Sequence, residues 1–370
     1  MEIKSGVGKL LLGCRRDTGG IAILYSQTSL HAATYYSKYG NPNDSQYDFI
    51  RILEDLNYQY RFISYEQLEQ GILKRENYRC LILPCSIALS DKERQQIYSF
   101  ANSGGKIIAD TKPGIYDEHA KPIKKMKWEK LLKNEFIMIG GAIKDYRKDN
   151  PDASGMRAFL GSKLEQIGIR PEFTVMPGKG EAYEGELAVF TQFKGQPLTG
   201  DENEKIRYIG LLRDHSPKIK KQEARIRLPY KSHIYNMRNG KYSGYTDNIN
   251  IDLGPGRAGL WAMLPYKVSS LKLDIDKKND VGGVVNFTAT INIESKQSPE
   301  RHVIRVEAFD PEGIRQRHYC RNLTTYKGRA KGTIPLALND KKGDWEIKAY
   351  EVVSGVSDIK KIRVRQKTKH

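Results

Sequence analysis

The sequence lacks any apolar run of about 18 residues or more, the length that a membrane-spanning helix needs. Its start, MEIKSGVGKLLLGCRRD, contains only a short leucine patch followed by two arginines. This start matches neither a membrane span nor a complete signal peptide. We therefore expect a soluble chain without a membrane span, and nothing in the sequence assigns its localisation.

Cysteine is scarce. Cys14, Cys80, Cys85 and Cys320 show no CxxC spacing and have no histidine at metal-ligand spacing, so we expect no zinc or other metal site. Cys80 and Cys85 lie at the two ends of an expected strand, roughly 16 Å apart, which is too far for a disulfide between them. The GKG and GPG triplets are too short for phosphate-binding loops, so no cofactor is expected.

Positive charge is in excess but is not concentrated. The chain has 62 Lys and Arg against 44 Asp and Glu, a net charge of +18. Its densest basic groups, at 121–133, 218–227 and 360–370, lie far apart and contain no nucleic-acid motif, so we expect no nucleic-acid partner. The charge leaves open a module that binds acidic glycans, and two tyrosine-rich segments could form stacking platforms for sugars. These tyrosines are Tyr35, Tyr36, Tyr39, Tyr230, Tyr235, Tyr242 and Tyr245.

Residues 20–110 alternate between strand and helix patterns. Apolar runs such as GGIAILYS and CLILP are typical of strands buried in a parallel sheet. The segment SQYDFIRILEDL predicts a helix capped at Asp44 or Ser45, with a buried stripe of Tyr47, Ile50, Leu53 and Leu56. Ser90 and Glu93 form a capping box that begins another helix. WEKLLKNEFIMIGG adds a further helix and a possible strand. The alternation predicts a doubly wound parallel sheet.

The segment DASGMRAFLGSKLEQIGIRP predicts one more helix, and from about residue 172 the chain changes to strand patterns. The Asn-Gly pair in RNGK, at 238–241, predicts a type I′ hairpin turn. In VNFTATINIE the apolar residues alternate from Val285 to Ile293, and HVIRVEAF and DWEIKAYEVV repeat this period of two. We expect a β-rich domain followed by an Ig-like sandwich.

Part of the chain resembles a known family. IAILYSQTS, CLILPCSIALSD and FANSGGKIIADTKPGIYDEH are similar to the trimerisation domain of β-galactosidases of glycoside hydrolase family 42, a domain related to class I glutamine amidotransferases. The shared motifs are the LSD helix start at 89–91, the Gly pair at 104–105 and the DEH triplet at 117–119. This resemblance covers about residues 18–130. The β segments are similar to the C-terminal β domains of bacterial proteins in which the same α/β domain follows a glycosidase-like barrel.

The resemblance and the patterns together predict a multidomain fold. We expect a flavodoxin-like, class I amidotransferase-like doubly wound sheet at 18–150, a β-rich domain at 151–266 and an Ig-like β-sandwich at 267–370. Residues 1–17 would be the exit segment of a missing barrel, or a linker. The resemblance implies a non-catalytic oligomerisation region of a glycoside hydrolase-like protein in carbohydrate metabolism. Its partners would be further copies of the chain, a glycosidase barrel or a polysaccharide.

The resemblance also implies where a nucleophile would stand. Class I amidotransferases place a cysteine in a tight turn at the end of a strand, next to a histidine. At the end of KIIAD this chain has Asp110 and Thr111, so the inherited nucleophile position is degenerate. We expect no catalysis there. Ser26, Asp117 and Glu118 would line the same crevice.

An enzymatic alternative remains open. Cys85 ends CLILP just before the Ser90 helix, and His31 or His119 follows other strands of the same sheet, so an amidotransferase-like or hydrolase site is conceivable. Against it, several residues separate Cys85 from the helix, no glycine shapes a strained turn, and buried cysteine is usually a small apolar residue. Glycoside hydrolysis would need two carboxyl groups about 5 to 9.5 Å apart, and Asp110 with Asp117 or Glu118 is the conceivable pair.

Overall fold

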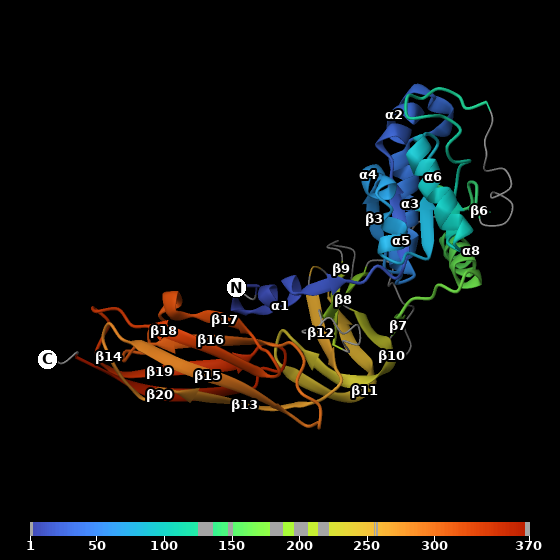
Figure 1. Ribbon diagram of the computed structural model, residues 1–370. Coiled ribbons are helices and arrows are strands. Elements are labelled where there is room, and N and C mark those ends of the chain that lie inside the picture. Colours follow the sequence, from blue (N-terminus) through green and yellow to red (C-terminus); the bar gives the residue numbers. More distant parts are fainter. Residues whose placement is uncertain are drawn as a thin grey trace.

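A computed structural model describes residues 3–124, 136–146, 151–177, 188–195, 206–213, 222–254, 256 and 258–366. The described elements form three units that follow one another along the chain: an α/β unit, a β-rich sheet and a β-sandwich (Figure 1). The β-rich sheet lies between the other two units, and the α/β unit projects from it at an angle to the sandwich. The fold is therefore mixed α/β with a large β portion.

The α/β unit is built on a parallel sheet. Its described strands lie in the order β3, β2, β4, β5, β6, and every neighbouring pair is parallel. The strands are β2 (Ile21–Tyr25), β3 (Arg61–Ser64), β4 (Cys80–Leu83), β5 (Lys106–Ala109) and β6 (Phe136–Met138). The helices are α2 (Gln27–Tyr35), η2 (Ser37–Tyr39), α3 (Pro42–Asp55), α4 (Tyr65–Glu69), α5 (Ile72–Arg75), α6 (Asp91–Asn102) and α8 (Ala153–Gln166). The helix expected in WEKLLK lies outside the described residues.

Helices cover both faces of this sheet. Leu68, Ile97 and Phe100 of α4 and α6 share one buried cluster with strand residues. Phe49 of α3 and Leu160 of α8 belong to the cluster on the opposite face. Helix α8 therefore packs on the parallel sheet, although residues 151–171 were expected to belong to the β-rich domain. Its apolar face needs a covered surface, and the sheet provides it.

Helix α3 begins and packs differently from the expectation. Its N-cap is Asn41, whose side chain accepts a hydrogen bond from the Asn43 amide, and Pro42 occupies the first turn, where a missing N–H costs nothing. The buried residues include Phe49, Ile52 and Leu53, whereas Tyr47 is 43% exposed. The expected stripe is confirmed in part: Leu53 is buried and Ile50 and Leu56 pack against the same cluster, but Tyr47 points away from it. The expected cap at Asp44 or Ser45 is wrong, because the helix begins earlier. The capping box of Ser90 and Glu93 is confirmed.

The β-rich sheet runs in the order β1, β8, β9, β12, β10, β11, with β7 also paired to β10, in the described residues. Its strands are β1 (Cys14–Arg16), β7 (Thr174–Pro177), β8 (Ala188–Gly195), β9 (Arg207–Arg213), β10 (Gln222–Asn236), β11 (Lys241–Leu253) and β12 (Ala258–Leu264). The expected type I′ turn between β10 and β11 is wrong. Gly240 has a φ of 68° but Asn239 does not have positive φ, and the Gly240 amide closes the loop onto the Asn236 carbonyl at 2.8 Å.

The sandwich consists of two facing sheets. One contains β13 (Val268–Ile275), β15 (Val284–Ile293) and β18 (Arg329–Pro335) in the order β13, β15, β18. The other, ordered β14, β20, β19, β16, β17, contains β14 (Lys278–Asp280), β16 (Val303–Phe309), β17 (Arg321–Thr324), β19 (Gly343–Glu351) and β20 (Ser357–Arg365), with the short helix η4 (Arg317–Tyr319) before β17. The expected inward residues, such as Phe287, Val306 and Trp345, are buried in a shared core. The alternation of these strands is confirmed.

The sandwich and the β-rich sheet share one hydrophobic core. Tyr208, Tyr235 and Leu264 of the sheet lie in the same buried cluster as the sandwich residues. The Tyr235 hydroxyl accepts a hydrogen bond of 2.9 Å from the Val268 amide, at the start of the sandwich. These two units therefore pack as a continuous body.

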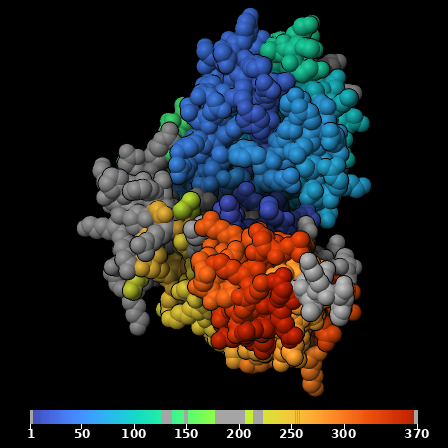
Figure 2. All heavy atoms as spheres, turned by 90° about the vertical axis from the view of Figure 1, so that its left-hand side faces the viewer, coloured from blue at the N-terminus to red at the C-terminus, as the bar shows by residue number. Residues whose placement is uncertain are grey.

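The N-terminal segment is docked on the two β units. Helix η1 (Ile3–Ser5) and helix α1 (Val7–Leu12) lie along the sandwich, and β1 then pairs with β8 (Figure 1). Leu10 of α1 is buried in the sandwich core, and Asn322 and Arg305 each donate a hydrogen bond to the Lys4 carbonyl. Figure 2 shows this segment between the α/β unit and the sandwich. Residues 3–16 therefore form a packed strap and not a free linker.

Candidate functional site

The carboxyl edge of the parallel sheet brings several of the sequence-predicted residues together. Cys85 follows β4, Asp110 follows β5 and Ser26 follows β2, so all three lie where parallel strands end. Open α/β sheets bind ligands outside this edge. We call this region the crevice.

Cys85 occupies a strained turn. Its φ is 39°, a left-handed value that residues with a Cβ rarely adopt. Its amide donates a hydrogen bond of 2.8 Å to Asp110 Oδ1, and its carbonyl accepts one of 2.8 Å from the Ile87 amide. No glycine shapes this turn, as the sequence shows, but Cys85 itself adopts the left-handed conformation and these two bonds hold it there. The strained position therefore follows β4, whereas the sequence placed the degenerate nucleophile position after β5.

The thiol of Cys85 is buried and protonated. Burial, reinforced by the charge of Asp110, raises the pKa of the Cys85 thiol to about 12. The sulfur lies 3.9 Å from the Tyr39 carbonyl oxygen. A thiolate, the form that attacks carbonyl carbon, is therefore very rare at neutral pH.

Asp110 supports the turn. Besides the Cys85 amide, its carboxylate accepts a hydrogen bond from the Ser45 hydroxyl, which α3 brings to the crevice. Burial raises the pKa of Asp110, while these hydrogen bonds and one from Thr111 oppose the rise. Asp110 therefore ties β4 and β5 to α3.

Neither candidate histidine forms a hydrogen bond with the Cys85 thiol among the described residues. His31 is exposed on α2, and His119 is exposed on the loop after β5. The nucleophile and base that a cysteine hydrolase needs are therefore not assembled in this structure.

Asp117, Glu118 and Ser26 have local structural settings. Burial alone would raise the pKa of Asp117, but the amides of Lys121 and His119 donate to its carboxylate and hold the pKa below its ordinary value. Glu118 is exposed. Ser26 is the N-cap of α2, and its hydroxyl accepts the Ser29 amide. Among the described residues, no hydrogen bond or ion pair links Asp110 to Asp117 or Glu118.

Tyrosine side chains fill the crevice above Cys85. The rings of Tyr36 and Tyr116 stack with their centroids 4.3 Å apart, and the Tyr39 hydroxyl lies 3.3 Å from that of Tyr116. Tyr36 also donates a hydrogen bond of 3.0 Å to the Ala120 carbonyl. These rings share a buried cluster with Cys85. Sequence reasoning named Tyr36 and Tyr39 but missed Tyr116, whose place after a strand end was the available signal.

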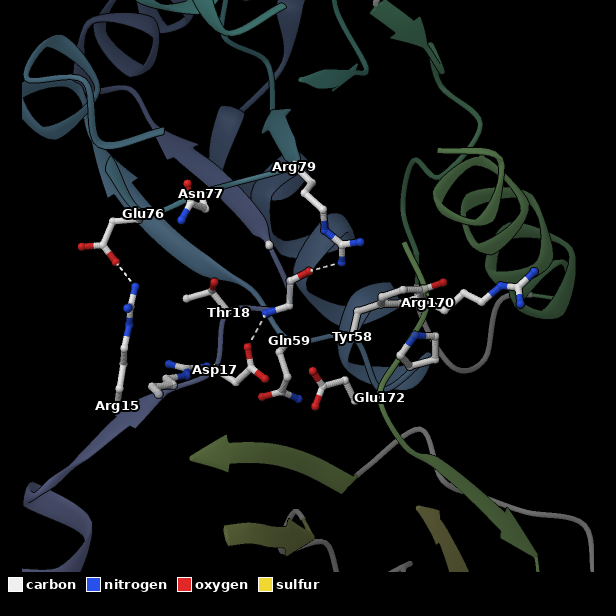
Figure 3. Close-up of a pocket in the computed structure, with 14 residues that line it drawn as sticks. Arg15, Asp17, Thr18, Tyr58, Gln59, Glu76, Asn77, Arg79, Arg170 and Glu172 are labelled. Atoms are coloured by element: carbon white, nitrogen blue, oxygen red, sulfur yellow. Dashed lines mark hydrogen bonds and ion pairs between the residues drawn. The ribbon is translucent and has the colours of Figure 1, made fainter. Parts of the chain in front are cut away.

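A second hollow lies at the opposite, amino edge of the sheet (Figure 3). Its volume is about 330 Å³. Part of its lining comes from the two segments that connect the α/β unit to the β-rich sheet, residues 15–20 and 170–172. Arg15 forms an ion pair with Glu76, and Arg79 donates to the carbonyls of Gly168 and Gly19. This lining was not expected from the sequence, since it is assembled from residues before three strands.

The polar residues around the amino-edge hollow hold the α/β unit and its two connecting segments together. Its arginines and carboxylates are interleaved, and the Asp17 carboxylate accepts the Gly19 amide at 3.1 Å (Figure 3). These contacts fix the two chain crossings to the base of the α/β unit. No cluster of metal-ligating side chains occurs in the residues that the structure describes, and none of its helices there is long and apolar enough to cross a membrane.

Comparisons with known proteins give distant matches. No protein-family model and no curated protein matches the chain. Among solved structures, a GH42 β-galactosidase, Gan42B from G. stearothermophilus, is 15% identical with a TM-score of 0.45, over 68% of this chain and 41% of its own. An exo-carrageenase GH42 from Bacteroides ovatus is 11% identical with a TM-score of 0.35, over 66% and 29%. A β-glucosidase from Listeria innocua is 11% identical with a TM-score of 0.21, over 96% and 48%. The chain is thus similar, at low identity, to glycosidases of whose length it spans less than half.

Proposed function

We propose that this chain is a non-catalytic accessory and assembly region of a glycoside hydrolase-like protein in carbohydrate metabolism. The resemblance of residues 18–130 to the GH42 trimerisation domain supports the relationship. Counted from the first strand of the α/β unit, the strand order is 2-1-3-4-5, the flavodoxin-like order, and this supports an amidotransferase-like ancestry. The facing antiparallel sheets after residue 267 support an Ig-like sandwich.

The observation that carries the proposal is the filled crevice. Cys85 has a left-handed backbone conformation, tyrosine rings pack beside it, burial raises the pKa of its thiol to about 12, and the Asp110 carboxylate accepts its amide. A protonated thiol in a packed cluster, with no hydrogen-bonded base among the described residues, supports a structural role for this site. The same scaffold then serves contact with other subunits or with a barrel.

Assembly is tested by mass. Size-exclusion chromatography with light scattering should give a multiple of the 42.2 kDa chain mass, or a complex when a glycosidase barrel is added. A strict monomer that is indifferent to any such barrel would contradict the proposal. Enzymatic turnover by the chain alone is measured separately. This distinguishes a monomer that catalyses a reaction from a monomer that does not.

The edge strand β3 is our candidate for the assembly contact. Edge strands present unpaired backbone groups to other chains. Phe62 on β3 is 38% exposed, and its ring lies edge-on to Tyr60 at 6.0 Å. Phe62→Glu should lower the assembled mass. Tyr98→Glu, on α6 and 45% exposed, is the matched control and should leave the mass unchanged. Equal masses for wild type and Phe62→Glu would exclude this edge.

The enzymatic alternative uses Cys85 with His31 or His119. It is tested by titrating the thiol: a Cys85 pKa near 9 together with iodoacetamide-sensitive turnover would favour it. A thiol that stays protonated up to about pH 11, with no such turnover, would remove it.

Binding of acidic glycans is the second candidate function, and the charge distribution favours it. Residues 267–370 contain 22 Lys and Arg against 13 Asp and Glu, which is +9 of the total +18. Many of these charges are paired, as in Lys267 with Glu294 and Arg363 with Asp344. Retention on a heparin column up to moderate salt would support this function, and elution at very low salt would discard it.

A further inference from the structure

The hairpin of β10 and β11 carries a row of aromatic side chains. The row begins in the core that the β-rich sheet shares with the sandwich and ends at the surface. Tyr235 is buried in the core shared with the sandwich, Tyr242 is half-buried beside it, and Tyr245 is 60% exposed. Tyr235 pairs directly with Tyr242 across the strands, and His233 pairs with Tyr245. Directly opposed residues share one face of an antiparallel sheet, so these four rings form one row.

A β-bulge builds this row. Tyr242 and Tyr245 are three residues apart, so in a regular strand they would point to opposite faces. The pairing register shifts between Ile234 and Tyr235, and Gly244 has a φ of 103°, a value that favours glycine. The extra residue returns Tyr245 to the face of Tyr242. Bulges that redirect a side chain occur often beside functional sites.

The rings hold each other in place. The centroids of His233 and Tyr245 are 4.9 Å apart, and those of Tyr235 and Tyr242 are 5.0 Å apart. His233 Nδ1 lies 2.7 Å from the Tyr242 hydroxyl. The exposed ring of Tyr245 therefore packs against the His233 imidazole, which the Tyr242 hydroxyl holds in place. Ligand binding should cost little side-chain conformational entropy here.

Polar groups border the aromatic row. Lys267 Nζ lies 2.8 Å from Glu294 Oε1 and 5.8 Å from the centroid of the Tyr242 ring. Burial and the charge of Lys267 lower the pKa of His233, against the effect of Glu294, so its imidazole is neutral at pH 7. His233 Nε2 makes no hydrogen bond within the described residues. The border thus offers hydrogen-bond donors and acceptors while its two formal charges cancel.

These features select one class of ligand. An exposed aromatic face attracts a flat ligand surface with C–H groups, because the ring face is negative and the C–H edges are positive. Charges that cancel give no attraction for phosphate or sulfate, and the Lys267 ammonium already lies near the Tyr242 ring, where a ligand cation would bind. A pyranose ring has one C–H face and a border of hydroxyls, which matches both parts of the patch.

We propose that His233, Tyr242, Tyr245, Lys267 and Glu294 form a binding surface for neutral hexopyranose oligosaccharides, in which the sugar stacks on Tyr245 and its hydroxyls bind His233 and the Lys267–Glu294 pair. The surface lies where the hairpin of β10 and β11 meets the start of the sandwich, and it shares no residue with the crevice or with β3. It goes beyond the assembly role and does not depend on it.

Affinity electrophoresis of the full chain tests this surface. The gels contain β-1,4-galactan, xyloglucan or mixed-linkage β-glucan as neutral probes, and κ-carrageenan as a sulfated probe. At least one neutral polymer should retard the chain, with retardation that survives high salt. Tyr245→Ala should weaken that binding roughly tenfold or more. Tyr326→Ala is the matched control: Tyr326 is 56% exposed and has Lys327 near its ring, and it should bind as wild type.

A second variant keeps every ring but removes the bulge geometry. In Gly244→Ala the added Cβ meets no neighbouring atom within 4 Å, so its effect comes from the backbone φ, and it should weaken binding while Tyr245 is still present. Light scattering on the same samples separates this surface from assembly, since Tyr245→Ala should not change the mass. Absence of retardation by all three neutral polymers, or equal retardation of wild type and Tyr245→Ala, would overturn the proposal. Salt-sensitive retardation by carrageenan alone would also overturn it, in favour of the acidic-glycan candidate.

Discussion

Removal of the Glu351 carboxylate should destabilise the sandwich strongly. Glu351 is fully buried where β19 ends, and its carboxylate faces four donors. His302 Nδ1 lies 3.1 Å away, the Val353 amide 3.0 Å, and the amide and hydroxyl of Ser354 each 2.6 Å. His302 Nε2 in turn lies 2.9 Å from the Tyr266 hydroxyl, on the segment that joins the β-rich sheet to the sandwich.

The magnitude follows from these bonds. A buried donor left without an acceptor costs about 1–3 kcal/mol, and Glu351→Ala leaves several such donors, whose total cost is reduced as the surroundings relax. We therefore expect Glu351→Ala to lower the free energy of unfolding by about 3–5 kcal/mol. Glu312→Ala is the control, because Glu312 has a 60% exposed side chain and pairs with Lys341 at the surface. Its loss should cost less than about 1 kcal/mol.

The effect should depend on pH in a defined direction. Burial alone would raise the pKa of Glu351, but His302, Ser354 and the Val353 amide hold it below its ordinary value. A depressed pKa contributes stability above the unfolded value of about 4.3, and this stability is lost as the pH falls through the folded pKa. The difference between wild type and Glu351→Ala should therefore shrink in acid.

Urea denaturation at about pH 7 and pH 3 measures both effects. Fluorescence reports on the sandwich because Trp345 is buried in its core. A loss below about 1 kcal/mol at neutral pH, or a difference that grows in acid, would refute this reasoning.

Three further predictions concern other parts of the chain. Cys85 should react with iodoacetamide at pH 8 at least tenfold more slowly than Cys320, as mapped by mass spectrometry, because its pKa is raised to about 12; equal rates would contradict its burial. Ser90→Ala removes the hydrogen bonds of the Ser90 hydroxyl to the Glu93 amide and to Glu69, and it should cost about 1 kcal/mol in urea unfolding, whereas the exposed Ser37→Ala should cost almost nothing. Leu10→Ala creates a cavity in the sandwich core and should lower the free energy of unfolding by about 2–5 kcal/mol. It should also increase hydrogen exchange in residues 3–16, and unchanged exchange would show that this side chain does not hold the strap.

Sequence patterns predicted the structure best where residues close together in the sequence determine the local conformation. In β15 the period of two from Val285 to Ile291 is enforced by burial of one face, and the structure keeps that phase. The capping box at Ser90 is local in the same way. Helix α3 was misplaced because Asn41 and Pro42, which begin it, precede the segment that was read as the helix.

The crevice could be predicted only in part. The positions of Cys85 and Asp110 follow from strand ends, which the sequence shows. The bond between the Cys85 amide and Asp110, the strained φ of Cys85 and the cover by Tyr116 depend on three loops that meet in space. The aromatic row on β10 and β11 likewise depends on a bulge at Gly244 that a regular strand pattern conceals.

Our central proposal is that the crevice of the α/β unit is a structural site and performs no reaction. The most direct test is turnover by the purified chain, measured with aryl glycosides and with glutamine as substrates. We predict no turnover above that of buffer, and no difference between wild type, Cys85→Ser and Asp110→Asn. Turnover by wild type that either substitution abolishes, in a variant that still folds, would contradict the claim.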